Sequence, residues 1–157
     1  MKIYKSFAIL FLLAMSSTLP ANAQVNDTAQ LRQMIDSSNF IFKATSAKPQ
    51  SSPSKVLTTG EYDLAVSKNK IVSFLPYFGR AYTAPPGEDG GIKFTSVDFK
   101  YTAEKSKNGW RITIIPKDVT SISKLYLDVS TGGYATLQVT SNNRQSISYY
   151  GVMEKTK

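Results

Sequence analysis

The sequence predicts a mainly β fold: an antiparallel meander of about eight strands that forms a curved sheet or a lipocalin-like barrel, with one short N-terminal helix. Three observations predict it. Apolar and polar residues alternate with period two over most of the chain, which indicates half-buried strands. Turn signals such as Asn108-Gly109 separate the alternating runs. Only one segment, near the N-terminus, has helical spacing.

The first 23 residues have the pattern of a secretory signal peptide, with lysines ahead of an apolar run at residues 7–15. This run is much shorter than the roughly 20 residues that span a bilayer, so a retained membrane anchor is the weaker interpretation. Small residues lead up to Ala23, so we expect cleavage between Ala23 and Gln24. No cysteine follows the run. We therefore expect a periplasmic or extracellular protein that is exported, is not lipidated and forms one β-rich domain over residues 24–157.

Residues 26–38 are predicted to form the helix. Leu31, Met34 and Ile35 fall on one helical face. Asp27 can cap the helix, and Gln30 three residues later completes a pattern that resembles a capping box. A helix this short needs a sheet to pack on. We expect it to close one end of the barrel or to cover the open face of the sheet.

Eight alternating runs are predicted to be strands, and a loop rich in serine and proline is predicted at residues 47–54. The runs lie at residues 40–44, 62–66, 71–75, 97–104, 110–115, 125–129, 135–139 and 146–152. Short turns join the last five runs, which predicts a five-stranded meander. A sheet of about eight strands twists, and it must curl or split. Sequential hairpins favour the barrel or half-barrel.

The stretch FLPYFGRAYTAPPGEDGGIKF at residues 74–94 groups the aromatic side chains of Phe74, Tyr77, Phe78 and Tyr82 around a single arginine, Arg80. On an extended chain Phe78, Arg80 and Tyr82 project to one side. A guanidinium between two rings can stack on either of them and still offer its donors to a carboxylate or phosphate. Tyr77 and Gly79 project to the other side, where bare backbone allows close approach.

Two interpretations of this stretch stay open. Pro76 indicates an edge, a bend or a strand end. The first interpretation is therefore a strand that bends over the rim of the barrel, with Arg80 held by loop carbonyls. The second is a pocket wall for an anionic or aromatic ligand, with Tyr77, Phe78, Arg80 and Tyr82 as its candidate residues.

Three segments together resemble DUF4251, a family of exported Bacteroidota proteins of unknown function. They are LPYFGRAY at residues 75–82, the acidic Gly-rich loop at 85–91 and SNNRQSISYYG at 141–151. The resemblance spans about residues 40–152. It implies a β-rich fold and an envelope location but no activity, and it adds Arg144 to the candidate ligand-binding residues. Many relatives look like lipoproteins. This chain has no cysteine to carry a lipid, so the resemblance does not imply attachment to a membrane.

The same resemblance singles out Asp27-Thr28-Ala29, which looks like the short sequence that receives O-glycans in exported proteins of these bacteria. Thr28 is therefore a candidate O-glycosylation site. The competing interpretation is the helix cap described above.

The chain contains no histidine and no cysteine. This excludes a Ser-His-Asp triad, His-dependent zinc sites and thiolate chemistry. We expect no enzyme activity, no metal and no cofactor. Glu61 and Asp63 stand two apart on a predicted strand, about 7 Å, which fits the separation of a glycosidase pair, but both are predicted to face outward. Glu88-Asp89 lacks the alternating acids of a calcium loop.

The formal net charge is +8, or +6 without the two lysines of the leader. For an exported protein the anionic neighbours are envelope components rather than nucleic acid, but no Lys/Arg cluster is dense enough to indicate more than solubility and weak nonspecific attraction. The rest of the chain has no apolar run of about 20 residues, so we expect no transmembrane segment. The favoured function is non-catalytic binding of an unknown small apolar or amphipathic ligand in a β-barrel. The alternative is an envelope protein–protein interaction module that docks through the edge at residues 77–82. A hydrolase ranks last.

Overall fold

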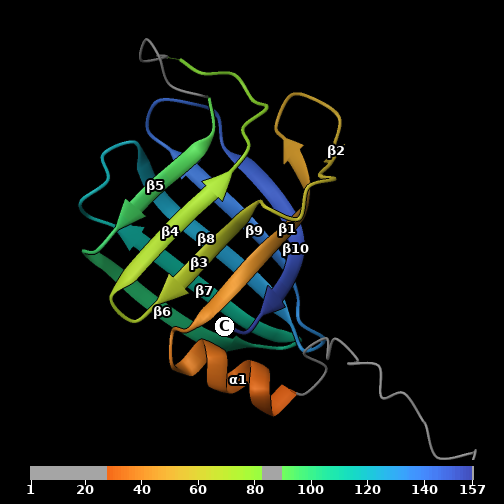
Figure 1. The fold of residues 1–157 in the computed structure, drawn as a ribbon, viewed down its shortest axis with the longest axis vertical. Coiled ribbons are helices and arrows are strands. Elements are labelled where there is room, and N and C mark those ends of the chain that lie inside the picture. Colours follow the sequence, from red (N-terminus) through yellow and green to blue (C-terminus); the bar gives the residue numbers. More distant parts are fainter. Residues whose placement is uncertain (1–27, 83–89, 157) are drawn as a thin grey trace, which may run out of the picture.

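The structure is a computed structural model that describes residues 28–82 and 90–156. The described residues form one helix, α1 (Thr28–Asp36), and ten strands (Figure 1). In chain order the strands are β1 (Phe40–Pro49), β2 (Lys55–Val56), β3 (Asp63–Ser67), β4 (Lys70–Leu75), β5 (Ile92–Ser96), β6 (Phe99–Ser106), β7 (Gly109–Pro116), β8 (Ile122–Ser130), β9 (Tyr134–Ser141) and β10 (Ile147–Glu154).

All the strands belong to one antiparallel sheet that curls into a nearly closed barrel. Its order is β5-β4-β3-β1-β10-β9-β8-β7-β6, and β2 pairs with β1 beside this path. β1 joins the two halves of the sheet because it pairs with β3 on one side and with β10 on the other. The predicted mainly β fold, with its meander over the last five strands, is confirmed.

The sequence missed two strands. β2 and β5 both lie outside the eight predicted runs. The alternation does not predict β5, because its inward face includes Ser96, a polar residue that is fully buried. The predicted loop at residues 47–54 also begins too early, because β1 continues to Pro49, which pairs with Ile147 of β10.

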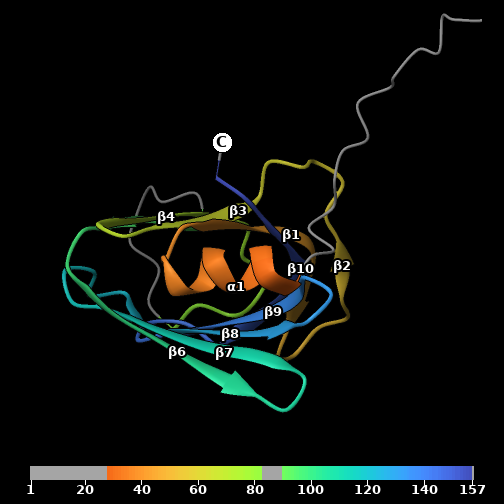
Figure 2. The same ribbon diagram turned by 90° about the horizontal axis from the view of Figure 1, so that it is seen from below.

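The helix covers one end of the barrel (Figures 1 and 2). This is the first of the two expected placements, the other being over the open face of the sheet. Its buried residues are Leu31, Met34 and Ile35, the face that the spacing predicted. It ends at Asp36, two residues earlier than predicted, because Ser38 has a φ of 51°. Ser38 N–H then donates to Ile35 O and Asn39 N–H to Met34 O, the pattern of a Schellman motif. The expected cap Asp27 lies outside the described residues.

The interior of the barrel is filled by side chains. Phe40, Phe42, Leu64, Ile112 and Tyr149 each have no accessible surface. A side chain that borders a water-sized cavity keeps some accessible area, so these residues are packed on all sides. The middle of the barrel is therefore a core rather than a ligand chamber.

The barrel has a seam between β5 and β6, which follow each other in the chain but are the two edges of the sheet. One end of the seam is held by the carboxylate of Asp118, in the turn between β7 and β8. It accepts hydrogen bonds from the Ser96 hydroxyl and from the backbone N–H groups of Val97 (2.8 Å) and Asp98 (3.2 Å). These donors, the Ser96 hydroxyl first, hold the pKa of Asp118 below its usual value.

We expect Asp118→Ala to destabilise the protein at pH 7, and we expect this difference from the parent to shrink as the pH falls below about 4. A carboxyl whose pKa is lowered by folding stabilises the fold above its unfolded pKa, and this contribution is lost as the pH falls through the folded pKa. Urea unfolding at pH 7 and pH 3 measures it. Glu104→Ala, an exposed acid on β6, is the control. An equally large difference at both pH values would contradict the prediction.

Candidate functional site

Residues 76–82, here called the signature stretch, close the end of the barrel opposite α1 (Figure 1). β4 ends at Leu75, because Pro76 has no backbone N–H to donate to a neighbouring strand. Tyr149 of β10 reaches this point from the core and donates its hydroxyl to Pro76 O at 2.6 Å. Burial raises the pKa of Tyr149 far above its usual value, so the hydroxyl remains a donor.

The two signature motifs, residues 75–82 and residues 141–151, are in direct contact. Ala81 forms a β-bridge with Arg144, Tyr82 N–H donates to Asn143 O at 2.9 Å, and Gln145 N–H donates to Arg80 O at 3.0 Å. Residues 76–82 are therefore fastened to the loop between β9 and β10 instead of extending the sheet.

The Tyr77 hydroxyl strengthens this connection because it lies 2.8 Å from Arg80 O and 2.9 Å from Gln145 O. A Cβ on Gly79 would overlap the Tyr77 hydroxyl and ring. The expected close approach at Gly79 is thus real, but the group that approaches is the protein's own tyrosine rather than a ligand.

Arg144 is the arginine that holds loop carbonyls. It is 8% exposed, and its Nη1 donates to Gly90 O at 3.0 Å and to Gly91 O at 3.2 Å. Its guanidinium carbon also lies 5.0 Å from the centre of the Tyr77 ring. Arg144 therefore connects the start of β5 to the closed end of the barrel, the role that one interpretation of the sequence gave to Arg80.

Arg80 itself is exposed, and the ring geometry predicted around it does not form in the described residues. The alternation fails because residues 76–80 are not in a strand. The ammonium group of Lys55, rather than Arg80, lies over the Phe78 ring, 4.5 Å from its centre. Tyr82 is 69% exposed and points away from the core.

The other predicted positions are scattered. Thr28 is exposed as the first residue of α1, and Ala23 and Gln24 lie outside the described residues, as does Glu88-Asp89. Asp63 faces outward and pairs with Lys43 at 2.8 Å, which leaves it poorly placed as a catalytic partner for Glu61. Within the described ranges no cluster of three or more His, Cys, Asp or Glu could hold a metal ion. No helix there is long and apolar enough to cross a membrane.

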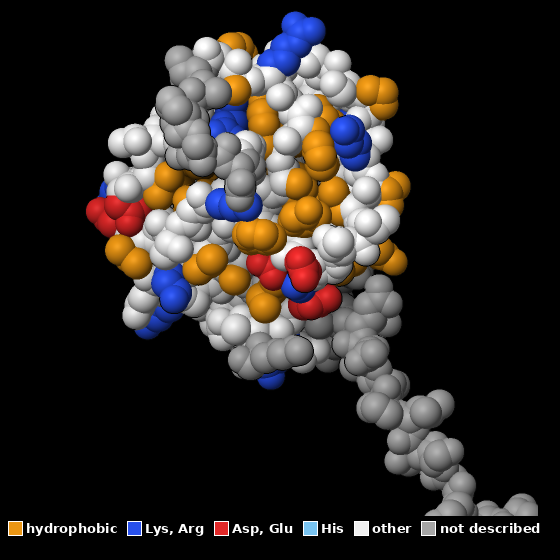
Figure 3. Space-filling model, turned by 45° about the horizontal axis from the view of Figure 1, so that its top comes forward, with side chains coloured by type: hydrophobic (Ala, Val, Ile, Leu, Met, Phe, Trp, Pro, Cys, Tyr) orange, Lys and Arg blue, Asp and Glu red, His pale blue; other side chains and the backbone are white. Residues whose placement is uncertain are grey.

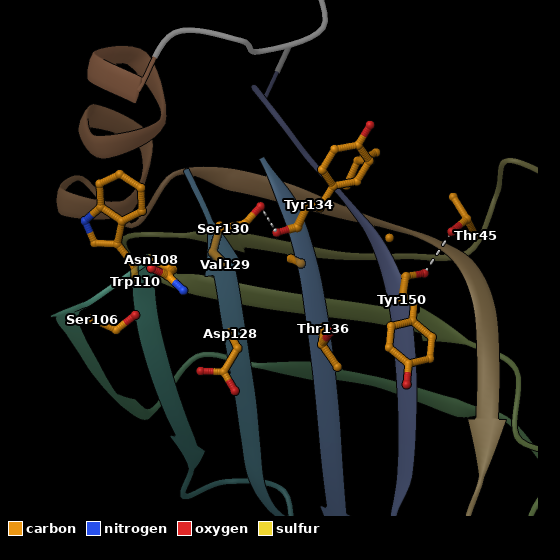
Figure 4. Close-up of a pocket in the computed structure, with 13 residues that line it drawn as sticks. Thr45, Ser106, Asn108, Trp110, Asp128, Val129, Ser130, Tyr134, Thr136 and Tyr150 are labelled. Carbon is orange, nitrogen blue, oxygen red and sulfur yellow. Dashed lines mark hydrogen bonds between the residues drawn. The ribbon is translucent and has the colours of Figure 1, made fainter. Parts of the chain in front are cut away.

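A groove of about 510 Å³ lies on the outer face of the sheet, over β6 to β10 and β1 (Figure 4). Register places Asp128 of β8 opposite Thr136 of β9, and Thr136 opposite Tyr150 of β10. These three side chains form a row across neighbouring strands. The complete lining is Thr45, Ser106, Asn108, Trp110, Asp128, Val129, Ser130, Tyr134, Ala135, Thr136, Tyr150, Gly151 and Val152.

Two tyrosines stand at the groove with their rings in solvent. Tyr134 is 62% exposed and Tyr150 is 42% exposed. Tyr134 pairs with Val152 and Tyr150 with Thr136, so the two tyrosines are diagonal neighbours on one face of the sheet. Ala135 and Gly151 also border the groove, at the inward positions that alternate with these outward residues.

The polar groups of the groove fall into two sets. The hydroxyls of Ser130 and Thr45 donate to Tyr134 O and Tyr150 O, each at 3.0 Å, and so support the backbone of the two tyrosines. Asp128 is the only charged residue among the described residues that line the groove. Its Oδ1 accepts a hydrogen bond from Arg111 Nε at 3.2 Å.

None of these groove residues was among the predicted site residues. In the run at residues 125–129 the alternation predicts a buried face of Leu125, Leu127 and Val129, and it assigns no role to the outward side chains. A signal was present: the outward positions include Tyr134 and Tyr150, and Trp110 is the only tryptophan of the chain.

A family model described as "Domain of unknown function (DUF4251)" matches residues 22–153. The chain belongs to the DUF4251 family. The resemblance seen in the sequence is thereby confirmed, and the family's description assigns no activity to its members. The contacts between the two signature motifs of this DUF4251 chain are compatible with a structural role for both.

The fold of this DUF4251 chain is similar to a solved structure, the crystal structure of a DUF4251 family protein from Bacteroides eggerthii DSM 20697. The two share 16% sequence identity, with a TM-score of 0.59 over 82% of this chain and 87% of the other. At that identity the likeness establishes the fold alone. No curated protein matches the chain.

Proposed function

We propose that this protein is an exported, non-catalytic binding protein that holds an amphipathic ligand in the groove on the outside of its barrel. The groove carries the proposal: it joins the exposed rings of Tyr134 and Tyr150 to a row of polar side chains in a space of about 510 Å³. The favoured sequence hypothesis placed the ligand inside the barrel. The packed interior moves the proposed site to the outer face.

Export and the lack of catalysis rest on the sequence. The leader pattern with cleavage between Ala23 and Gln24 supports a periplasmic or extracellular location, and the absence of cysteine after the apolar run supports an unlipidated chain. The absence of histidine and cysteine supports binding rather than catalysis. An O-glycan at Thr28 is part of the same proposal, supported by the exposure of that residue.

A second candidate function is docking of an envelope protein at the edge at residues 77–82. Its support is the exposure of large apolar side chains in the first half of the chain, namely Val56 at 81%, Tyr82 at 69% and Phe74 at 39%. Hydrophobic side chains gather over the middle of one face of the molecule (Figure 3). Tyr and Arg are frequent anchors of protein interfaces.

Native mass spectrometry of the protein purified from its own host is the test. We expect a small co-purifying mass on the parent protein and at least a tenfold lower occupancy on the double variant Tyr134→Ala/Tyr150→Ala, because truncating both rings removes their contact area. The control is Tyr82→Ala, which removes an exposed tyrosine outside the groove.

The outcomes separate the two functions. Retention of the small mass by the double variant would contradict the groove as its site. A co-purifying protein chain that is lost from Tyr82→Ala, with no small mass on the parent, would favour the docking function instead.

A further inference from the structure

We infer that the groove binds a neutral saccharide. This inference rests on the proposed function and specifies its ligand. The decisive feature is the combination of side chains on one open face of the sheet. Two solvent-exposed tyrosine rings lie there beside the hydroxyl of Thr136 and the carboxylate of Asp128.

The tyrosines provide flat apolar surfaces that remain in contact with water. A pyranose ring is amphipathic in a matching way, because its faces carry C–H groups and its edge carries hydroxyls. One face can therefore lie on the ring of Tyr134 or Tyr150 while the edge points to the polar side chains. Tyr rings lose little conformational entropy when they bind, which favours them as stacking surfaces.

The polar groups are placed to receive that edge. In the described part of the chain, the hydroxyls of Tyr134, Tyr150 and Thr136 have no hydrogen-bond partner, and neither does Oδ2 of Asp128. Asp128, Thr136 and Tyr150 follow one another across adjacent strands, at about 4.8 Å per strand. A row of this spacing suits hydroxyls on successive units of a di- or trisaccharide.

Charge selects against the competing ligands. Within residues 28–82 and 90–156, Asp128 is the one charged side chain in the lining. The nearby cation Arg111 already donates from Nε to its Oδ1 at 3.2 Å. A fatty acid, an anionic lipid or an acidic polysaccharide would bring a second negative charge to Asp128, which is unfavourable. A carboxylate is, however, a strong acceptor for hydroxyl donors.

The open shape selects against a hydrocarbon chain. Burial of apolar surface stabilises a complex in proportion to the area removed from water. The exposed positions of Tyr134 and Tyr150 show that a ligand here keeps one side in solvent. A sugar tolerates that exposure because its outer edge is polar, whereas an alkyl chain does not.

Trp110 is the only tryptophan of the chain and borders the groove from an inward position of β7, where it is 7% exposed, so its fluorescence is read together with isothermal titration calorimetry. Its fluorescence is followed while neutral hexose oligosaccharides of two to six units, oligouronates and dodecanoate are each added. We expect at least one neutral oligosaccharide to bind with a dissociation constant below about 1 mM. Tyr150→Ala is expected to weaken it about 10-fold, and Tyr82→Ala to leave it unchanged.

Two further variants test the role of Asp128. Asp128→Asn is expected to weaken neutral oligosaccharides about 10-fold and to improve oligouronates relative to them, because it removes the charged acceptor. Arg111→Gln breaks the same exposed ion pair but keeps the carboxylate, so we expect affinity to stay within about 2-fold. Equal losses in the two variants would mean that Asp128 acts only through its ion pair with Arg111, which overturns its role as a ligand acceptor.

The result also separates this inference from the proposed function. Dodecanoate or oligouronates could bind in preference to every neutral sugar and lose this binding in Tyr150→Ala. That result would overturn the inference of a neutral saccharide and retain the groove as a ligand site. Failure of all the neutral oligosaccharides to change the Trp110 signal or to bind in calorimetry would overturn the saccharide inference. The native mass measurement then decides on the groove itself.

Discussion

Replacing Tyr149 with alanine is expected to lower the free energy of unfolding by about 3–5 kcal/mol. Tyr149 is fully buried among the inward side chains of the barrel, and its hydroxyl donates to Pro76 O at 2.6 Å. Truncation removes the packing of the whole ring and leaves a cavity that a closed sheet cannot readily collapse. Urea unfolding followed by far-UV circular dichroism measures the change.

Tyr149→Phe separates the two contributions because it keeps the ring and removes only the hydroxyl. We expect a loss of about 1–3 kcal/mol, since Pro76 O is left without its donor. The matched control is Tyr150→Phe, one residue along the same strand, where the ring is 42% exposed. That change is expected to stay within about 0.5 kcal/mol. A Tyr149→Phe protein as stable as the parent would mean that the hydrogen bond to Pro76 does not hold the signature stretch.

Gly151→Ala is expected to destabilise the protein by about 1–3 kcal/mol. β1 and β10 approach closely at this point, beside the register shift between Ala44 and Ser46. A Cβ on Gly151 would overlap Lys43 O of the neighbouring strand and would lie 2.9 Å from the Phe42 ring. Backbone cannot move aside as a flexible side chain does, so the two central strands must separate.

The control for this prediction is Gly60→Ala, because nothing lies within 4 Å of a Cβ at Gly60. We expect its free energy of unfolding to stay within about 0.5 kcal/mol of the parent. Thermal and urea unfolding of both variants give the comparison. Equal stability of Gly151→Ala and Gly60→Ala would contradict the close approach of β1 and β10.

The strands that the sequence predicted well are those whose inward face is uniformly apolar. β8 is an example: Leu125, Leu127 and Val129 are all at most 3% exposed, so its alternation is unbroken. β5 was missed because Ser96 interrupts that pattern, and its burial depends on Asp118, which is 22 residues away. A partner so distant in the chain leaves no local signal.

The candidate residues show the same division. The motifs at residues 75–82 and 141–151 were recognised as related features, and the structure brings them into contact through Ala81 and Arg144. Which arginine would be buried was not predictable. Arg80 and Arg144 are both flanked by polar or aromatic residues in the sequence, and only the closure of the barrel brings Arg144 to the carbonyls of Gly90 and Gly91.

The sequence by itself determined the mainly β class, the meander of the second half, the apolar face of the helix and the membership of a family. These follow from periodicity and short motifs, which act over a few neighbouring residues. Only the tertiary structure decided that the barrel is filled, that the signature stretch closes its end, and that Asp128, Thr136 and Tyr150 form a row. Each depends on strand register and curvature, which bring together residues from separate strands.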